Sequence, residues 1–305
     1  MAVGKNARTI WSHGMLLLTA LIWGIAFVAQ KSGGDLLGPL TFNGARSLIA
    51  APALWLATVL LDRVGVSRPC ATPRERKTLW IGGVLCGVAL FAATNMQQLG
   101  LQYTSVGKGG FITALYIVLV PLLGLFVKKQ VPLPVWLGVA LAVAGLYLLC
   151  GGMDGAWNVG DLMLLACALL FSVQILLVSR YAPQVDGVRL SCIQFLVVGV
   201  LNLPLMLIFE QPSLRVMAEN WLPLLYAGLL SSGVGYTLQI LAQRHADPTA
   251  ASLLMSFESV FAVLAGWVLL GDPMSLAELA GCGLLFAAVI LAQLPAPKRK
   301  ENGHG

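Results

Sequence analysis

The sequence predicts an all-α polytopic membrane protein whose ten transmembrane helices form two inverted five-helix repeats. Three observations lead to this fold class. Apolar runs fill the chain, which is 58% hydrophobic and 10% charged, whereas about 25% of the residues in a typical soluble domain are charged. Lys and Arg gather in every second gap between the runs. The two halves of the chain also align with each other.

Each apolar run is about as long as a bilayer-crossing helix, because about 20 residues at about 1.5 Å rise span a hydrocarbon core of about 30 Å. In chain order, the predicted spans are His13–Gln30, Pro39–Leu61, Thr78–Gly100, Ser105–Val127, Leu133–Cys150, Asn158–Ser179, Val188–Phe209, Trp221–Ala242, Thr249–Leu270 and Leu276–Leu294. They form one transmembrane domain over residues 1–305, with repeat one at about 13–150 and repeat two at about 158–294.

The basic residues predict the orientation, since short cytoplasmic loops are enriched in Lys and Arg. With the N-terminus in the cytoplasm, 15 of the 19 basic residues fall in cytoplasmic segments. The opposite side carries Lys31, Lys108 and Arg215, and Arg46 lies within a predicted helix. We therefore expect both termini in the cytoplasm. The basic loops, which account for the net charge of +6, then face an anionic lipid leaflet. No nucleic-acid partner is therefore expected.

The two halves are joined by a short linker at Gly151–Gly155. A shift of 142 residues aligns Ser105–Leu149 with Asp247–Leu291 without a gap. Because each half has an odd number of spans, the second half enters the membrane from the opposite side. Inverted repeats are typical of secondary transporters, whose substrate site lies near the membrane midplane between the repeats.

Within the ninth predicted span, the stretch Ala250–Ala262 (AASLLMSFESVFA) resembles the ninth helix of EamA-type transporters. Leu21–Gly24 (LIWG) and the Ala45-Arg46 pair are similar to that family's first two helices. This family is the ten-helix branch of the drug/metabolite transporter superfamily. The resemblance implies a carrier that moves small metabolites, amino acids or drugs, usually outward. The family commonly has Glu-Pro in the ninth helix, where this chain has Glu258-Ser259, so the proline that would break the helix is absent.

Polar side chains inside the predicted spans recur at helical spacing. In the eighth span, Ser232, Tyr236, Gln239 and Gln243 share one face. Such groups face the protein interior or water, because exposing them to lipid is costly. They either hydrogen bond between helices or line a polar cavity, and several stripes together favour the cavity. The candidate substrate-binding residues are Trp23, Asn95, Gln98, Tyr116, Gln174, Tyr236, Gln239 and Glu258.

Glu258 is an acidic residue in the middle of a predicted span, where an ionised carboxylate costs about 2.5–3.5 kcal/mol on insertion scales. We therefore expect its carboxyl to be neutral, paired or hydrated. A proton-coupled carrier could use such a group. Alternatively, the carboxyl only fixes its helix to a neighbour. Tyr116 occupies the corresponding position in the first half.

Arg46 lies roughly 12 Å into the second span at about 1.5 Å per residue. It could pair with a carboxylate, bind an anionic substrate group, reach outward to the lipid headgroups or make a structural hydrogen bond, and the last two roles are favoured. The six cysteines show no CxxC spacing, and the three histidines lie at predicted helix ends or in the tail. No metal, cofactor or catalytic residue is therefore predicted.

These features favour a secondary transporter of a small-molecule substrate, a multi-pass protein of the cell inner membrane. The alternatives are a structural or assembly protein that transports nothing, and an intramembrane enzyme, for which Glu258 is the single candidate group. The transporter could also assemble as a homodimer. The sequence does not identify the substrate.

Overall fold

The computed structural model describes residues 5–67, 69–104, 106–126, 131–150, 157–265, 267–268 and 274–292. Eight helical segments in this part of the chain are long and apolar enough to cross a membrane, and two shorter apolar helices, α6 (Leu133–Leu149) and α14 (Leu276–Ala292), coincide with the predicted fifth and tenth spans. The protein is therefore an all-helical, polytopic membrane protein. The linker predicted at 151–155, the basic cluster at 298–300 and the predicted ends of the ninth and tenth spans lie outside the described residues.

Besides α6 and α14, five of the predicted spans are single helices. They are α1 (Lys5–Leu37), α2 (Pro39–Arg63), α3 (Pro73–Gly100), α7 (Val159–Tyr181) and α8 (Gly187–Phe209). The first helix is longer at both ends than the predicted His13–Gln30. The third begins at Pro73 instead of Thr78, because Thr72 and Glu75 form a capping box that adds a polar first turn to the apolar run.

Three predicted spans are divided, which hydropathy alone did not indicate. The fourth consists of α4 (Val106–Ala114) and α5 (Tyr116–Phe126), and the ninth consists of α12 (Pro248–Met255) and α13 (Phe257–Ala265). The eighth consists of α10 (Trp221–Leu225), the π-helical segment η2 (Tyr226–Gly235) and α11 (Tyr236–Gln243). Two short elements, η1 (Ala182–Gln184) and α9 (Leu214–Glu219), lie between spans.

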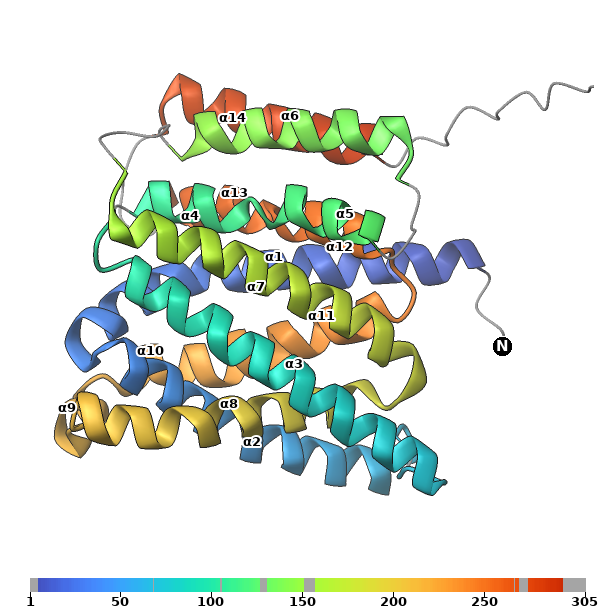
Figure 1. Cartoon of the computed structure of the whole chain (residues 1–305), viewed down its shortest axis with the longest axis vertical. Helices are drawn as coiled ribbons and strands as arrows, with labels where there is room; N and C mark the ends of the chain where they lie inside the picture. Colours follow the sequence, from blue (N-terminus) through green and yellow to red (C-terminus); the bar gives the residue numbers. More distant parts are fainter. Residues whose placement is uncertain are drawn as a thin grey trace, which may run out of the picture.

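Corresponding helices of the two halves lie at the two ends of the molecule (Figure 1): α6 and α14 at one end, α2 and α8 at the other. Each of these pairs is in extensive contact, and between them α3 packs on α7 and α1 packs on α13. The second helix of each half thus meets its counterpart, and so does the fifth. The other helices enclose the middle of the molecule.

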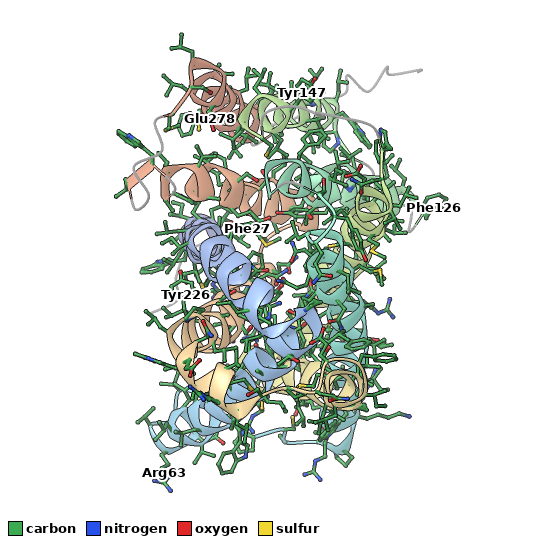
Figure 2. All side chains as sticks on the ribbon, turned by 90° about the vertical axis from the view of Figure 1, so that its left-hand side faces the viewer. Phe27, Arg63, Phe126, Tyr147, Tyr226 and Glu278 are labelled. Atoms are coloured by element: carbon green, nitrogen blue, oxygen red, sulfur yellow. The ribbon has the colours of Figure 1, made fainter. Side chains whose placement is uncertain are left out.

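The outer surface is apolar, as a hydrocarbon environment requires. Figure 2 shows carbon-rich side chains along the outside of the helices, with Phe126 pointing away from them. Phe126 is 86% exposed, and Leu276 is equally exposed at the start of α14. A soluble protein rarely exposes contiguous apolar surface of this extent.

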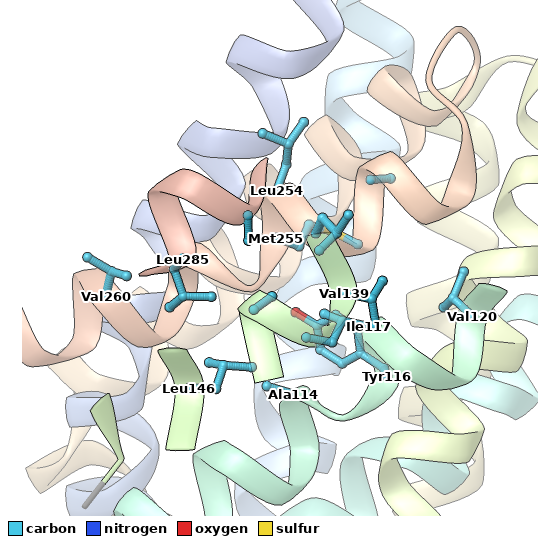
Figure 3. Close-up of a cluster of buried hydrophobic side chains, with 14 of the residues drawn as sticks. Ala114, Tyr116, Ile117, Val120, Val139, Leu146, Leu254, Met255, Val260 and Leu285 are labelled. Carbon is cyan, nitrogen blue, oxygen red and sulfur yellow. The ribbon is translucent and has the colours of Figure 1, made fainter. Parts of the chain in front are cut away.

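A buried apolar cluster joins the broken helices to α6 and α14. Ile117, Met255 and Leu285 belong to it. Figure 3 shows that Tyr116 also lies among these apolar side chains. The cluster packs the divided helices firmly on one side, so that their breaks lie between this apolar layer and the centre of the molecule.

Candidate functional site

A small cavity of about 40 Å³ lies where helices of both halves meet. Six of the eight residues predicted from the sequence line it: Trp23, Tyr116, Gln174, Tyr236, Gln239 and Glu258. Nine further lining residues were not among the candidates from the sequence: Phe27, Gln30, Arg46, Gln97, Thr113, Phe171, Ile175, Ser231 and Met255. The lining thus combines aromatic rings, amides, one guanidinium and one carboxyl.

The hydroxyl of Tyr116 donates a hydrogen bond of 3.2 Å to Oε1 of Glu258 across a separation of 142 residues. That separation equals the shift that aligns the two halves. Both side chains are buried, and each lies in the first turn of the second segment of a divided helix. The breaks at Leu115 and Ser256 therefore bring the two corresponding residues to one place.

The helix break before Glu258 has a local cause, although no proline is present. The hydroxyl of Ser256 donates to the carbonyl of Leu253 at 2.8 Å, and the Ser259 amide donates to the Ser256 carbonyl three residues back. Serine hydroxyls that bond to nearby backbone carbonyls compete with regular helix geometry. Ser256 and Ser259 are therefore the sequence signal for the break in this chain, where the family pattern has a proline.

Gly24 brings α1 close to the carboxyl-bearing helix. A Cβ atom at this position would lie 2.7 Å from the Glu258 carbonyl oxygen and 2.6 Å from Cβ of Phe261. Any larger residue would therefore push α1 away from α13. Because Trp23 precedes Gly24, the same close approach places the indole beside the cavity.

An aromatic group forms another wall of the cavity. The rings of Trp23 and Tyr236 have centroids 4.5 Å apart, and Phe195 meets Tyr236 edge-on at 5.3 Å. The indole Nε1 donates to the carbonyl of Ser231 at 3.2 Å. Tilted and edge-on pairs of this kind are favourable ring geometries, so the wall is well defined.

The π-helical geometry of η2 is supported by α1. The Tyr236 amide donates to the Ser231 carbonyl five residues back, and the Thr19 hydroxyl donates to the Gly235 carbonyl at 3.2 Å. Side chains of α1 thus satisfy carbonyl groups of the wider helix. π-Helical turns are rare and occur often at functional sites, and this one precedes Tyr236 directly.

A chain of amides leads from the cavity into the second half. Nε2 of Gln239 donates to Oε1 of Gln174 at 3.3 Å, and Nε2 of Gln174 donates to Oε1 of Gln194 at 3.1 Å. Oε1 of Gln239 and Nε2 of Gln194 are buried without a protein partner. Buried amides normally bond to protein or water, so these atoms are free to bond to a solute.

Asn95 and Gln98 lie outside the cavity lining. Oδ1 of Asn95 accepts from Nδ2 of Asn43 at 3.0 Å, and Nε2 of Gln98 donates to the Gln30 carbonyl at 3.1 Å. Both residues therefore join α3 to neighbouring helices, which was the alternative role for polar stripes. The neighbouring Gln97 faces the cavity instead. The 142-residue alignment could have indicated it, because Gln97 corresponds to Gln239.

Arg46 is buried, with 4% of its surface exposed, and it lines the cavity. The sequence-based alternative that it reaches outward to the headgroups is therefore wrong. Its helix begins at Pro39, directly after Gly38, whose φ of 83° allows the chain to turn. The Glu210 carboxylate accepts from the amides of Leu40 and Thr41 at 3.0 and 2.6 Å. These contacts anchor the start of α2 and fix the depth of Arg46.

The described residues contain no group of three or more His, Cys, Asp or Glu that could hold a metal ion. Glu258 stands as the one acid among the lining residues that the structure describes. The arrangement is suited to binding a solute through hydrogen bonds, ring contacts and charge.

Comparison with known proteins agrees with the helical architecture and the paired halves. The model of the EamA-like transporter family matches two segments of the chain, residues 10–151 and 158–294. The chain belongs to the EamA-like transporter family.

Several relatives of this EamA member are named as transporters. An uncharacterized transporter of Archaeoglobus fulgidus is 30% identical over 95% of this chain and 88% of its own length. The uncharacterized inner membrane transporter YedA of Escherichia coli is 26% identical over 92% and 90%. A solved crystal structure with 21% identity superposes with a TM-score of 0.76 over 93% of this chain and 97% of its own, which shows the same fold.

Proposed function

We propose that this EamA member is a secondary transporter that exports a small polar solute across the inner membrane by alternating access. The observation that carries the proposal is the contact between Tyr116 and Glu258 inside a polar cavity. Two residues related by a two-fold axis can touch each other only close to that axis. The cavity therefore lies on the axis that relates the proposed inverted repeats, where transporters of this kind hold their substrate.

The size of the cavity supports a conformation in which the two halves are closed around the site. A volume of about 40 Å³ holds roughly three water molecules at about 10–15 Å³ each. Small-molecule pockets usually measure about 300–1,000 Å³. A solute larger than water therefore enters when the halves move apart, and rocking about the axis opens the site to one side at a time.

The direction of transport and the membrane rest on the resemblance to outward carriers of the family and on the inner membrane named for the YedA relative. Proton coupling rests on Glu258, whose carboxyl is buried in the cavity wall. A proton on this carboxyl would neutralise it when the site is closed, and its release would be possible when water reaches the site.

The experiment compares the medium of cells that overproduce the wild type, Gln239→Leu or Val234→Leu. Gln239 lines the cavity, whereas Val234 is 42% exposed on the outer face of η2 and serves as the matched control. We expect one solute to accumulate in the medium of cells that produce the wild type or Val234→Leu. At equal amounts of folded protein, its level should be several-fold lower with Gln239→Leu. The enriched solute is then loaded into proteoliposomes that contain only the purified protein. Flux no faster than in protein-free liposomes would refute the proposal.

A further inference from the structure

The guanidinium of Arg46 lies in the cavity wall without a negative partner in the described part of the chain. The ion pairs there join Arg189 to Asp62 and Arg215 to Glu219. Glu258, the acid of the cavity, accepts a hydrogen bond from Tyr116 instead. The guanidinium of Arg46 instead lies over the ring of Phe42, whose centroid is 5.9 Å from Cζ.

An arginine in this setting needs a partner. Its side chain stays protonated in proteins, and its Nε is buried without a hydrogen bond to protein. Removing such a charge from water is costly unless an opposite charge and hydrogen bonds replace the lost hydration. A cation–π contact with Phe42 recovers part of that cost but supplies no hydrogen-bond acceptor.

The charges of the cavity also break the internal symmetry of the fold. Arg46 is the eighth residue of α2, and the eighth residue of the corresponding α8 is Gln194. Glu258 likewise corresponds to the neutral Tyr116. The scaffold therefore does not require charge at either position, since the other half packs with uncharged residues there. This favours a role toward a solute.

We propose that Arg46 is the docking site for a single carboxylate group on the transported solute. The planar guanidinium matches a carboxylate with two parallel hydrogen bonds. Arg46 is the cation among the described lining residues, so one negative charge is balanced, whereas a phosphate ester with about −1.5 to −2 charges would remain under-compensated. This inference deepens the proposed function by naming the class of solute.

The test measures the charge preference of the cavity without the need for a known solute. Ser231 lines the cavity and is 2% exposed, and Ser231→Cys is nearly isosteric. In a background without the six native cysteines, this thiol is treated with two methanethiosulfonate reagents, one sulfonate-bearing and anionic, the other trimethylammonium-bearing and cationic. The ratio of the anionic to the cationic reaction rate is the readout.

We expect Arg46→Gln to lower this ratio by roughly tenfold or more, because a unit charge within several Å acts on both reagents with opposite sign. Arg46→Lys should keep most of the preference. Arg180→Gln, which removes an exposed charge at the end of α7, should leave it unchanged. An unchanged ratio in Arg46→Gln overturns the inference. Failure of both reagents to react also overturns it, because a docking site for a solute must open to water.

The solute identified by comparing media provides an independent check. It should carry one carboxylate at neutral pH, and its amide analogue should compete at least about tenfold more weakly, as expected when a charge-assisted bidentate pair is lost. A transported solute that is neutral or purely cationic overturns the inference while the transport function stands. If proteoliposomes show no flux but the ratio of the two thiol reaction rates shifts as expected, the anion site is supported and the proposed transport function is refuted.

Discussion

The carboxyl of Glu258 is held by one hydroxyl from the opposite half, and this contact can be tested atom by atom. Oε1 accepts from Tyr116 at 3.2 Å, and the amide oxygen of a glutamine could accept the same bond. Replacing the acid by its amide therefore keeps the shape and the contact while it removes the exchangeable proton. The distinction between a coupling role and a structural role depends on that proton.

For Glu258→Gln, we predict a folded protein whose proton-driven accumulation of solute falls at least about tenfold, while counterflow exchange persists. The melting temperature should stay near that of the wild type, because the amide replaces a buried carboxyl of equal size with its acceptor retained. Transport rates at several pH values, measured beside thermal unfolding in detergent, provide the check. A variant with the wild-type pH dependence of transport would remove Glu258 from the coupling mechanism.

Tyr116→Phe is the matched control for that prediction. It removes the hydroxyl that donates to Glu258 but leaves the carboxyl in place. We expect transport to keep its pH dependence, with a loss of stability of about 1 kcal/mol for one buried hydrogen bond. If Tyr116→Phe and Glu258→Gln lose pH dependence equally, the hydrogen bond matters more than the proton on the carboxyl.

At the level of helices, hydropathy predicted the spans but not their interruptions. The breaks at Leu115 and Ser256 lie inside runs that are apolar on average, and a hydropathy average does not depend on local backbone geometry. The π-helical turns before Tyr236 receive a hydrogen bond from Thr19, which lies far away in sequence. The stripe on α3 depends on packing in a related way: Gln97 and Gln98 are neighbours that face about 100° apart, and only the tertiary packing shows which one meets the cavity.

The close packing of α1 on α13 gives a prediction with a control on the same helix. Gly24→Ala places a Cβ atom 2.7 Å from the Glu258 carbonyl oxygen, so the helices must separate, and we expect a loss of about 1–3 kcal/mol, as for overpacked cores. Gly14 has no neighbouring atom within 4 Å of such a Cβ. Gly14→Ala should therefore be neutral or stabilise the helix by up to about 1 kcal/mol. The melting temperatures of the two variants test this prediction. Equal melting temperatures would contradict the close approach of α1 to α13.

At the scale of the whole molecule, charge and internal alignment carried most of the sequence-based information. The alignment placed Tyr116 opposite Glu258, and the structure joins these residues directly. The role of Arg46 was not decided by the sequence, because depth in a span does not show which way a long side chain points. The orientation in the membrane is a property of the molecule as a whole, and it stays a prediction from the distribution of basic residues.

That orientation can be tested on the full-length chain with single cysteines in the background that lacks the native ones. Val66, after α2, is 73% exposed, and Leu214, at the start of α9, is 82% exposed. If the positive-inside bias sets the topology, an impermeant maleimide added to intact cells should label Leu214→Cys at once. It should label Val66→Cys only after the membrane is opened. A reporter inserted at 151–155 should likewise be external, because five spans separate it from the cytoplasmic N-terminus. Labelling of Val66→Cys alone would reverse the topology, and labelling of both positions in intact cells would show that the chain inserts in two orientations.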